Sequence, residues 1–223
     1  MKKQNNKTFR GALCFLAAFV LWTAAVRFID VRAVGPLDSS VGFATVNAAF
    51  HRLTGEHMFL YQLTDWLEII PLGCVAGFAL LGLAQLVKRK SLWKVDYDIL
   101  VLGGFYVAVM AAYVLFEVLA VNYRPVLIEG VLEASYPSST TLLVLCVMPT
   151  TIMQADGRVK NESLKKGVRY AIIVYTAFMV FCRLVSGVHW LTDIIGGALL
   201  GAGLVLLYAF VADAQIIKAR KSS

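Results

Sequence analysis

Charged residues are scarce in this sequence, and their scarcity indicates the class of protein. Only 16% of the 223 residues are charged, whereas 59% are hydrophobic and the mean hydropathy is +0.73. A soluble domain has about 25% charged and about half apolar residues. The composition therefore predicts an integral membrane protein, with one membrane-embedded domain over residues 1–223.

Cysteine is scarce as well, and its placement argues against two kinds of site. The four cysteines all lie inside apolar runs, with no Cys-x2-Cys pair: Cys14, Cys74, Cys146 and Cys182. Cysteines placed in this way behave as small buried hydrophobes. We therefore expect neither a disulfide nor a zinc site, and no cofactor is expected. The net charge of +7 comes from short basic patches between apolar runs, so no nucleic acid partner is expected either.

Six long apolar runs predict an all-α bundle of six transmembrane helices. They cover about residues 11–29, 66–87, 97–121, 139–154, 168–185 and 191–212. Most reach the roughly 20 residues that a helix needs to cross a bilayer. The fourth run is shorter and contains Pro149, which predicts a kink or an early end.

The basic residues predict how this bundle is oriented. With six spans, 16 of the 21 lysines and arginines fall on one side, which the positive-inside rule makes cytoplasmic. Both termini are then cytoplasmic, in what we expect to be a bacterial plasma membrane. The five basic residues left on the outer side are Arg27, Arg32, Arg52, Arg124 and Arg183.

Three polar residues stand between the last two apolar runs and predict a functional site. Arg183, His189 and Asp193 are costly at membrane depth and therefore indicate function. Arginine binds phosphate oxygens in a fork, and histidine is a nucleophile or proton carrier near neutral pH. An aspartate four residues later shares the helix face and can orient the imidazole. The trio predicts a phosphoryl-transfer site.

Other polar groups are expected on the same outer side. Arg124 follows the third run, and Ser138 or Ser139 would cap the helix of the fourth. A helix N-terminus offers free N–H groups to an anion. We therefore expect one outward-facing site, with Arg124, Arg183, Ser138 and Ser139 binding phosphate.

In these motifs the sequence resembles the type 2 phosphatidic acid phosphatases, which include lipid phosphate phosphatases and undecaprenyl-diphosphate phosphatases. The family has three motifs, Lys-x6-Arg-Pro, Pro-Ser-Gly-His and Ser-Arg-x5-His-x3-Asp. The matching positions are Arg124-Pro125, Pro137-Ser138, and Arg183, His189 and Asp193, with Cys182 in place of the serine. The resemblance implies that His189 attacks phosphorus to form a phosphohistidine and that Asp193 holds its ring. It also implies that no metal is needed.

The first two motifs depart from the family pattern. Glu117 stands in the place of the lysine, Ser139 in that of the glycine and Thr140 in that of the histidine. In the family this histidine is the general acid, a role that Thr140 cannot fill at neutral pH. A lipid alkoxide, about as basic as hydroxide at ~15–16, needs a proton to leave, whereas a phosphomonoester with a pKa near ~6 needs little help. A retained activity is therefore expected to favour lipid diphosphates.

Several other groups are candidates for a replacement acid. Glu117 either pairs with Arg124 or Arg183 or supplies the acid itself. The further candidates lie in the outer loops: His51, His57, Glu129 and Glu133. By contrast, Asp65 with Glu68 is interpreted only as a capping box that opens the second span.

The sequence thus predicts a membrane phosphatase that hydrolyses a lipid phosphate or diphosphate at the outer face, with undecaprenyl diphosphate the leading substrate. Its partners would be this lipid and the surrounding membrane. Two alternatives stay open: a phosphotransferase that passes the phosphoryl group to another acceptor, and a catalytically silent protein that binds or moves lipid.

Overall fold

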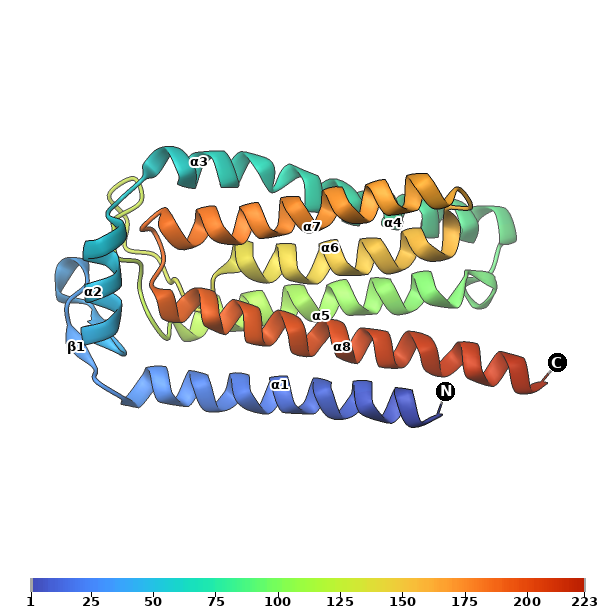
Figure 1. Ribbon diagram of the computed structural model, residues 1–223, viewed down its shortest axis with the longest axis horizontal. Coiled ribbons are helices and arrows are strands. Elements are labelled where there is room, and N and C mark those ends of the chain that lie inside the picture. The colour runs from blue at the N-terminus through green and yellow to red at the C-terminus, as the bar shows by residue number, and fades with distance from the viewer. Residues whose placement is uncertain (1, 223) are drawn as a thin grey trace.

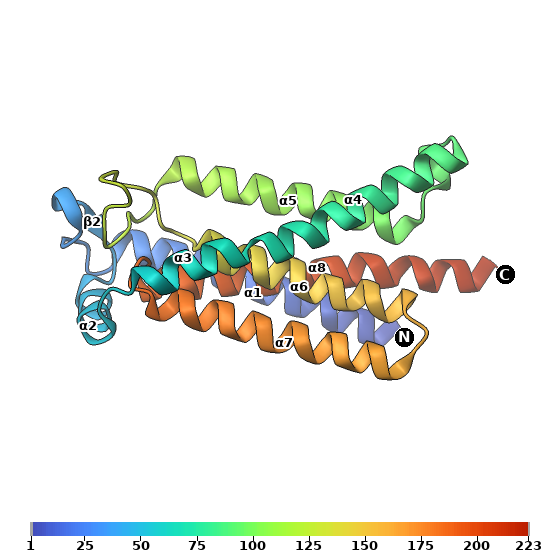
Figure 2. The ribbon, with the colours of Figure 1, turned by 90° about the horizontal axis from the view of Figure 1, so that it is seen from above.

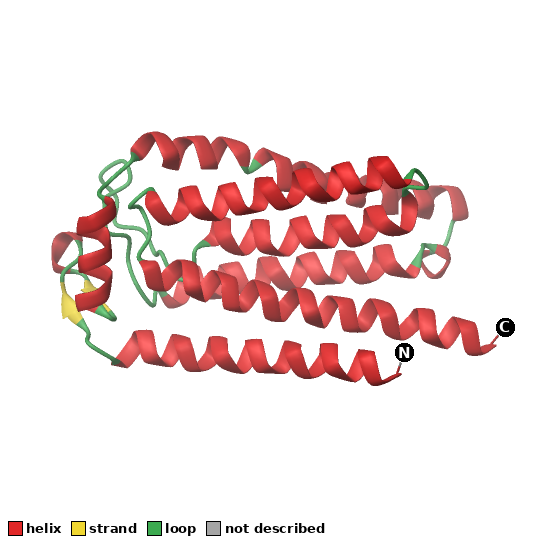
Figure 3. Cartoon of the chain, in the orientation of Figure 1, coloured by secondary structure: helices red, strands yellow, loops and turns green. Residues whose placement is uncertain are grey.

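The computed structural model describes the backbone of residues 2–222 and the side-chain environment of residues 6–212. Most of this part of the chain is helical (Figure 3). Its α-helices are α1 (Lys2–Phe28), α2 (Ala44–Thr54), α3 (Met58–Leu67), α4 (Ile69–Arg89), α5 (Tyr97–Leu119), α6 (Ser139–Arg158), α7 (Glu162–Val185) and α8 (Leu191–Ser222). The shorter elements are β1 (Arg32–Ala33), β2 (Ser40–Val41), η1 (Pro36–Asp38) and η2 (Leu92–Lys94).

The long helices lie side by side along one axis, and the two ends of the bundle differ (Figures 1 and 2). The start of α1, the end of α8 and the connections from α4 to α5 and from α6 to α7 lie at one end. The opposite end carries α2, the antiparallel pair β1–β2 and the loop between α5 and α6. We call this end, with α2, β1, β2 and the loops around them, the cap. The basic patches of residues 88–94 and 158–169 lie at the other end of the bundle.

The predicted all-α membrane architecture agrees with the structure, but the count of six spans is not confirmed. Five segments of the described residues are long and apolar enough to cross a membrane: Asn6–Phe28, Met58–Arg89, Tyr97–Leu119, Glu162–Val185 and Leu191–Ala212. Helix α6 lies between other helices of the bundle and parallel to them (Figure 1). It is not among the five, because threonines and Gln154 make its sequence less apolar. Many of its side chains are buried against protein, so it does not need an apolar surface all round.

Pro149 does not end the fourth helix, contrary to one of the two expectations for it. Helix α6 continues to Arg158. A proline removes one backbone donor, and nearby hydroxyl groups can satisfy carbonyl groups in this part of a helix. The Thr150 hydroxyl donates to the Cys146 carbonyl at 2.9 Å, and that of Thr151 donates to Val147 at 2.8 Å.

Close packing between α6 and α8 brings the starts of these two helices together. A Cβ added to Gly197 would lie 3.1 Å from the Ser138 carbonyl oxygen, and one at Gly201 would lie 3.1 Å from Leu145 Cβ. The Ser138 N–H also donates to the Asp193 carbonyl at 3.1 Å. Around this contact an apolar core is shared by α1, α5, α6 and α8. The start of α6 is thereby held beside the first turn of α8.

Two predicted helix starts are wrong. The second span begins at Met58 rather than near residue 66, so Asp65 lies inside α3 and Glu68 lies where α3 meets α4. Neither residue caps the segment, because the helix begins about two turns further towards the N-terminus than the apolar run suggests. The sequence also offers Ser39 or Ser40 as the cap of a short helix ending near Gly55, but helix α2 has Phe43 as its N-cap, and only its end before Gly55 agrees.

Candidate active site

A short loop, residues 186–190, joins α7 to α8 and carries His189. Gly187 has φ +73°, and a Cβ there would lie 2.2 Å from the Gly55 carbonyl oxygen, so only glycine fits this turn. The cap holds the loop from the other side. The His57 N–H donates to the Ser186 carbonyl at 2.9 Å, and His51 Nε2 lies 3.1 Å from the Gly187 carbonyl oxygen.

The hydrogen bonds of His189 fix its tautomer. The side chain is buried, with Nδ1 3.1 Å from the Ser135 carbonyl oxygen and 3.7 Å from Asp193 Oδ2. Both oxygens accept, so Nδ1 carries the proton and Nε2 keeps its lone pair. Nε2 lies 3.4 Å from an Arg124 guanidinium nitrogen. The ring nitrogen with the free lone pair therefore faces a side chain of a type that binds phosphate.

The pKa of His189 is well below its ordinary value of 6.5. Burial is the largest cause, because it disfavours the charged imidazolium. The positive charges of Arg124 and Arg183 lower the pKa further, while the hydrogen bond to Ser135 opposes them. The imidazole is thus neutral at pH 7, which is the form that can attack phosphorus.

Asp193 is held by donors on both of its oxygens. It is fully buried in the first turn of α8. Oδ2 accepts from the Trp190 N–H at 3.0 Å, and Oδ1 accepts from the Asn122 amide at 3.3 Å. These bonds aim the carboxylate at His189, as the four-residue spacing predicts.

Arg183 of the trio and Arg124 of the first motif both lie against the ring of Tyr61. The guanidinium carbons of Arg183 and Arg124 lie 4.7 Å and 5.7 Å from the centre of the Tyr61 ring. Arg124 also forms an ion pair with Glu133, Nε to Oε2, at 2.9 Å. The structure therefore brings together Arg124 and Arg183, two side chains 59 positions apart in the sequence.

Arg183 is buried and held from α3 and the start of α4. It donates to the Thr64 hydroxyl at 3.0 Å and to the Tyr61 carbonyl at 3.2 Å. A second nitrogen lies 3.5 Å from both Asp65 Oδ1 and Glu68 Oε1. The two expected partners of Glu117 are therefore paired with other carboxylates: Arg183 with Asp65 and Glu68, and Arg124 with Glu133.

The two serines at the start of α6 differ in position. Ser138 is the N-cap, as predicted, and its buried hydroxyl accepts from the Thr141 N–H at 3.5 Å. Its oxygen is thus used within the helix. Ser139 instead lines the cavity that contains His189.

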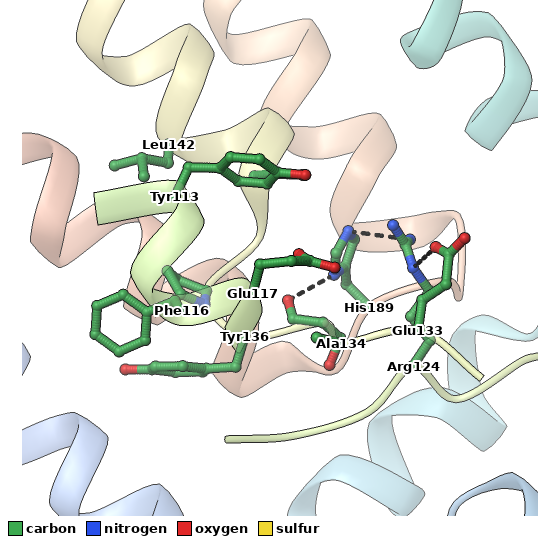
Figure 4. Close-up of a pocket in the computed structure, with 12 residues that line it drawn as sticks. Tyr113, Phe116, Glu117, Arg124, Glu133, Ala134, Tyr136, Leu142 and His189 are labelled. Carbon is green, nitrogen blue, oxygen red and sulfur yellow. Dashed lines mark hydrogen bonds and ion pairs between the residues drawn. The ribbon is translucent and has the colours of Figure 1, made fainter. Parts of the chain in front are cut away.

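A polar cavity of about 160 Å³ brings part of the predicted site together (Figure 4), but Arg183 and Asp193 are not among its lining residues. His189, Arg124, Glu133, Glu117 and Ser139 all line it. Thr140 and His57 are not among its lining residues, and neither is His51, which packs against the loop before α8. Glu117 lines the cavity, but it forms no ion pair with Arg124 or Arg183.

An apolar cleft of about 240 Å³ adjoins the polar cavity. It lies among α4, α5 and α6 and shares three lining residues with the cavity: Tyr113, Ser139 and Leu142. Its other walls are almost wholly apolar, apart from Glu68. Together the two spaces suit a molecule with a phosphate head and a hydrocarbon tail.

Glu68 is the site residue that sequence reasoning missed. The Thr140 hydroxyl donates to Glu68 Oε1, and the same oxygen lies 3.5 Å from Arg183. A carboxylate inside an apolar segment was the available signal, since such residues indicate function. Among the described residues, no group of three or more histidine, cysteine, aspartate or glutamate side chains is arranged to hold a metal ion.

Comparison with known proteins supports a type 2 phosphatidic acid phosphatase-like protein. The model of the PAP2 superfamily matches residues 117–216, which include His189, Asp193 and both arginines. The resemblance predicted from the motifs is thus confirmed.

The fold is similar to one solved structure in particular, a transmembrane PAP2-type phosphatidylglycerolphosphate phosphatase from Bacillus subtilis. The two share 18% sequence identity with a TM-score of 0.63, over 92% of this chain and 96% of that one. At this identity the likeness concerns the fold. No curated protein sequence matches the chain.

Proposed function

We propose that this protein is a membrane phosphatase that hydrolyses a lipid phosphate or diphosphate. One observation carries the proposal: neutral His189, backed by Asp193 and facing Arg124, lines a polar cavity that adjoins an apolar cleft. The match to the PAP2 superfamily supports the same chemistry. A pure binding site would not require the histidine–aspartate pair.

In the proposed reaction, His189 Nε2 attacks phosphorus and the lipid leaves. Asp193 and the Ser135 carbonyl keep the proton on Nδ1 and stabilise the charge that develops on the ring. Arg124 and Arg183 would hold the non-bridging oxygens, and water then releases phosphate from the phosphohistidine. Catalysis of this kind depends on positioning and on charge stabilisation.

The substrate is proposed to be a lipid because the cleft beside the cavity is apolar. Undecaprenyl diphosphate remains the leading candidate, and phosphatidic acid is the simplest monoester. The name of the Bacillus subtilis relative adds phosphatidylglycerol phosphate. We further propose that the cavity faces the outside of the cell, since it lies at the end of the bundle away from the basic patches.

One observation favours the alternative of a silent lipid-binding protein. Both arginines already have carboxylate partners, Arg124 in Glu133 and Arg183 in Asp65 and Glu68. A substrate phosphate must compete with these carboxylates. Hydrolysis remains the better proposal because the buried pair of His189 and Asp193 has no role in mere binding.

The test measures phosphate release by the purified protein from undecaprenyl diphosphate, phosphatidic acid and phosphatidylglycerol phosphate. We expect His189→Ala to lose about 10⁴–10⁶-fold in rate, the range found when a nucleophile or its base is removed. His57→Gln is the matched control, because His57 is exposed on the cap and does not line the cavity. Background release by both wild type and His189→Ala would refute hydrolysis. Label recovered on a second lipid would identify a transferase.

A further inference from the structure

Thr140 stands where the family has an acid, and it contacts one. Its side chain is buried in the first turn of α6, and its hydroxyl donates to Glu68 Oε1. Glu68 lies 72 positions earlier in the chain, where α3 meets α4. The position that lacks the family's histidine is thus in contact with a carboxyl group from another helix.

The surroundings of Glu68 leave one oxygen available. Thr140 and Arg183 both contact Oε1, the arginine at 3.5 Å, so Oε2 is the oxygen that can carry a proton. The side chain is only 23% exposed. Burial disfavours a charged carboxylate and the nearby Arg183 favours it, so a role as an acid requires that Glu68 hold its proton in the free enzyme.

Glu68 also lies beside the place where the two spaces meet, because its partner Thr140 follows Ser139 in the chain. It lines the apolar cleft together with Ser139, and Ser139 lines the polar cavity of His189 as well. A lipid with its tail in the cleft and its phosphate in the cavity has its ester oxygen at this junction. Glu117, the other carboxylate near the site, lines the polar cavity but not the cleft.

We propose that Glu68 is the general acid that protonates the leaving oxygen of a lipid phosphate, with Thr140 positioning it. The inference rests on the proposed phosphatase function. As His189 Nε2 bonds to phosphorus, the bond from phosphorus to the lipid oxygen breaks. Its electron pair stays on that oxygen, which takes the proton from Glu68 Oε2. The Glu68 carboxylate then takes a proton from the water that hydrolyses the phosphohistidine.

The leaving group provides the test, because only a poor one needs an acid. The lipid alcohol of phosphatidic acid has a pKa of about 15–16, close to that of water. Farnesyl diphosphate releases a phosphomonoester whose pKa is near ~6. We expect Glu68→Gln to lower kcat/KM for phosphatidic acid by about 10²–10⁴-fold. The same substitution should lower kcat/KM for farnesyl diphosphate by less than about tenfold, since this leaving group needs little protonation.

Two matched variants separate the acid from other roles. Asp65→Asn removes the other carboxylate that lies 3.5 Å from Arg183, so it tests the effect of charge on that arginine. Glu117→Gln tests the other carboxylate at the site. In both variants, the ratio of kcat/KM for phosphatidic acid to kcat/KM for farnesyl diphosphate should stay near that of wild type. Glu68→Asp, which keeps a carboxyl group, should retain part of the phosphatidic acid activity that Glu68→Gln loses.

Each remaining outcome overturns the inference. Equal losses on both substrates in Glu68→Gln would make Glu68 a structural partner of Arg183. A changed ratio in Glu117→Gln alone would make Glu117 the acid. If the wild-type protein hydrolyses farnesyl diphosphate but not phosphatidic acid, then no residue acts as a general acid for the leaving oxygen. Failure of the phosphatase function is distinct, because wild type and His189→Ala would then release phosphate equally from both substrates.

Discussion

The two halves of the site are held in different ways. In the nucleophile half (Ser135, His189 and Asp193), main-chain groups fix the side chains: the Ser135 carbonyl accepts from His189, and the Trp190 N–H donates to Asp193. In the leaving-group half (Glu68, Glu117 and Thr140), the contact that joins two helices is between side chains. A geometry fixed by main chain depends little on neighbouring residue types. One fixed by side chains can be rebuilt with other residues, which is where the family motifs change.

After His189→Ala, the largest effect within the nucleophile half is expected from Asp193→Asn. Both carboxylate oxygens of Asp193 accept N–H groups, from Trp190 and from Asn122. An amide has one oxygen, so its NH2 group would face a donor and the correct tautomer of His189 would lose support. By analogy with the aspartate of a catalytic triad, we expect a loss of about 10²–10⁴-fold in kcat, measured as phosphate release.

Asp38→Asn is the control for this substitution. Asp38 is an exposed aspartate of the cap with φ +56°, a conformation that asparagine adopts readily. Thermal unfolding in detergent, measured for both variants, separates a loss of catalysis from a loss of fold. A folded Asp193→Asn protein with unchanged kcat would show that the ring of His189 is held by Ser135 alone.

A smaller effect is expected from pH, and it also concerns the nucleophile half. Because burial and two arginines lower the pKa of His189 well below 6.5, the imidazole is still mostly neutral at pH 6.5. The kcat/KM profile reports the free enzyme, so it should keep more than half of its plateau value at that pH. Removal of a neighbouring positive charge favours the imidazolium. Arg124→Gln should therefore move the acid limb of the profile to higher pH, whatever its effect on the plateau.

An acid limb centred above pH 6.5 would contradict this prediction. It would mean that His189 titrates like an exposed histidine and that the site is open to water. A limb that does not move in Arg124→Gln would show that Arg124 does not lower the pKa of His189. In that case the arginine lies further from the ring in solution than the 3.4 Å of the structure.

The nucleophile half could be predicted from sequence because its information is local. His189 and Asp193 are four residues apart, and the apolar runs around them locate the helices. To place Arg124 at the same site, one further step was needed: the basic residues had to show which helix ends lie on the same side of the membrane. The PAP2 match over residues 117–216 covers this same part of the chain.

The leaving-group half could not be predicted in this way because its contacts are long-range. The contact of Thr140 with Glu68 depends on how α6 packs against the junction of α3 and α4. The pattern near Asp65 and Glu68 also resembled a helix start, which gave both residues a local explanation. That explanation concealed an acidic side chain placed within an apolar segment, the signal that would have identified Glu68.

The smallest predicted effect lies at the border of the two halves, in Glu133→Gln. Glu133 competes with substrate phosphate for Arg124, and its side chain is 38% exposed, so the ion pair is a weak one. Exposed pairs contribute about 0.2–1 kcal/mol, so KM should fall by no more than about fivefold while kcat is unchanged. Glu129→Gln, an exposed carboxylate of the same loop, should leave KM as it is. A higher KM in Glu133→Gln would instead mean that Glu133 orients Arg124 towards phosphate, because the loss of a mere competitor cannot weaken substrate binding.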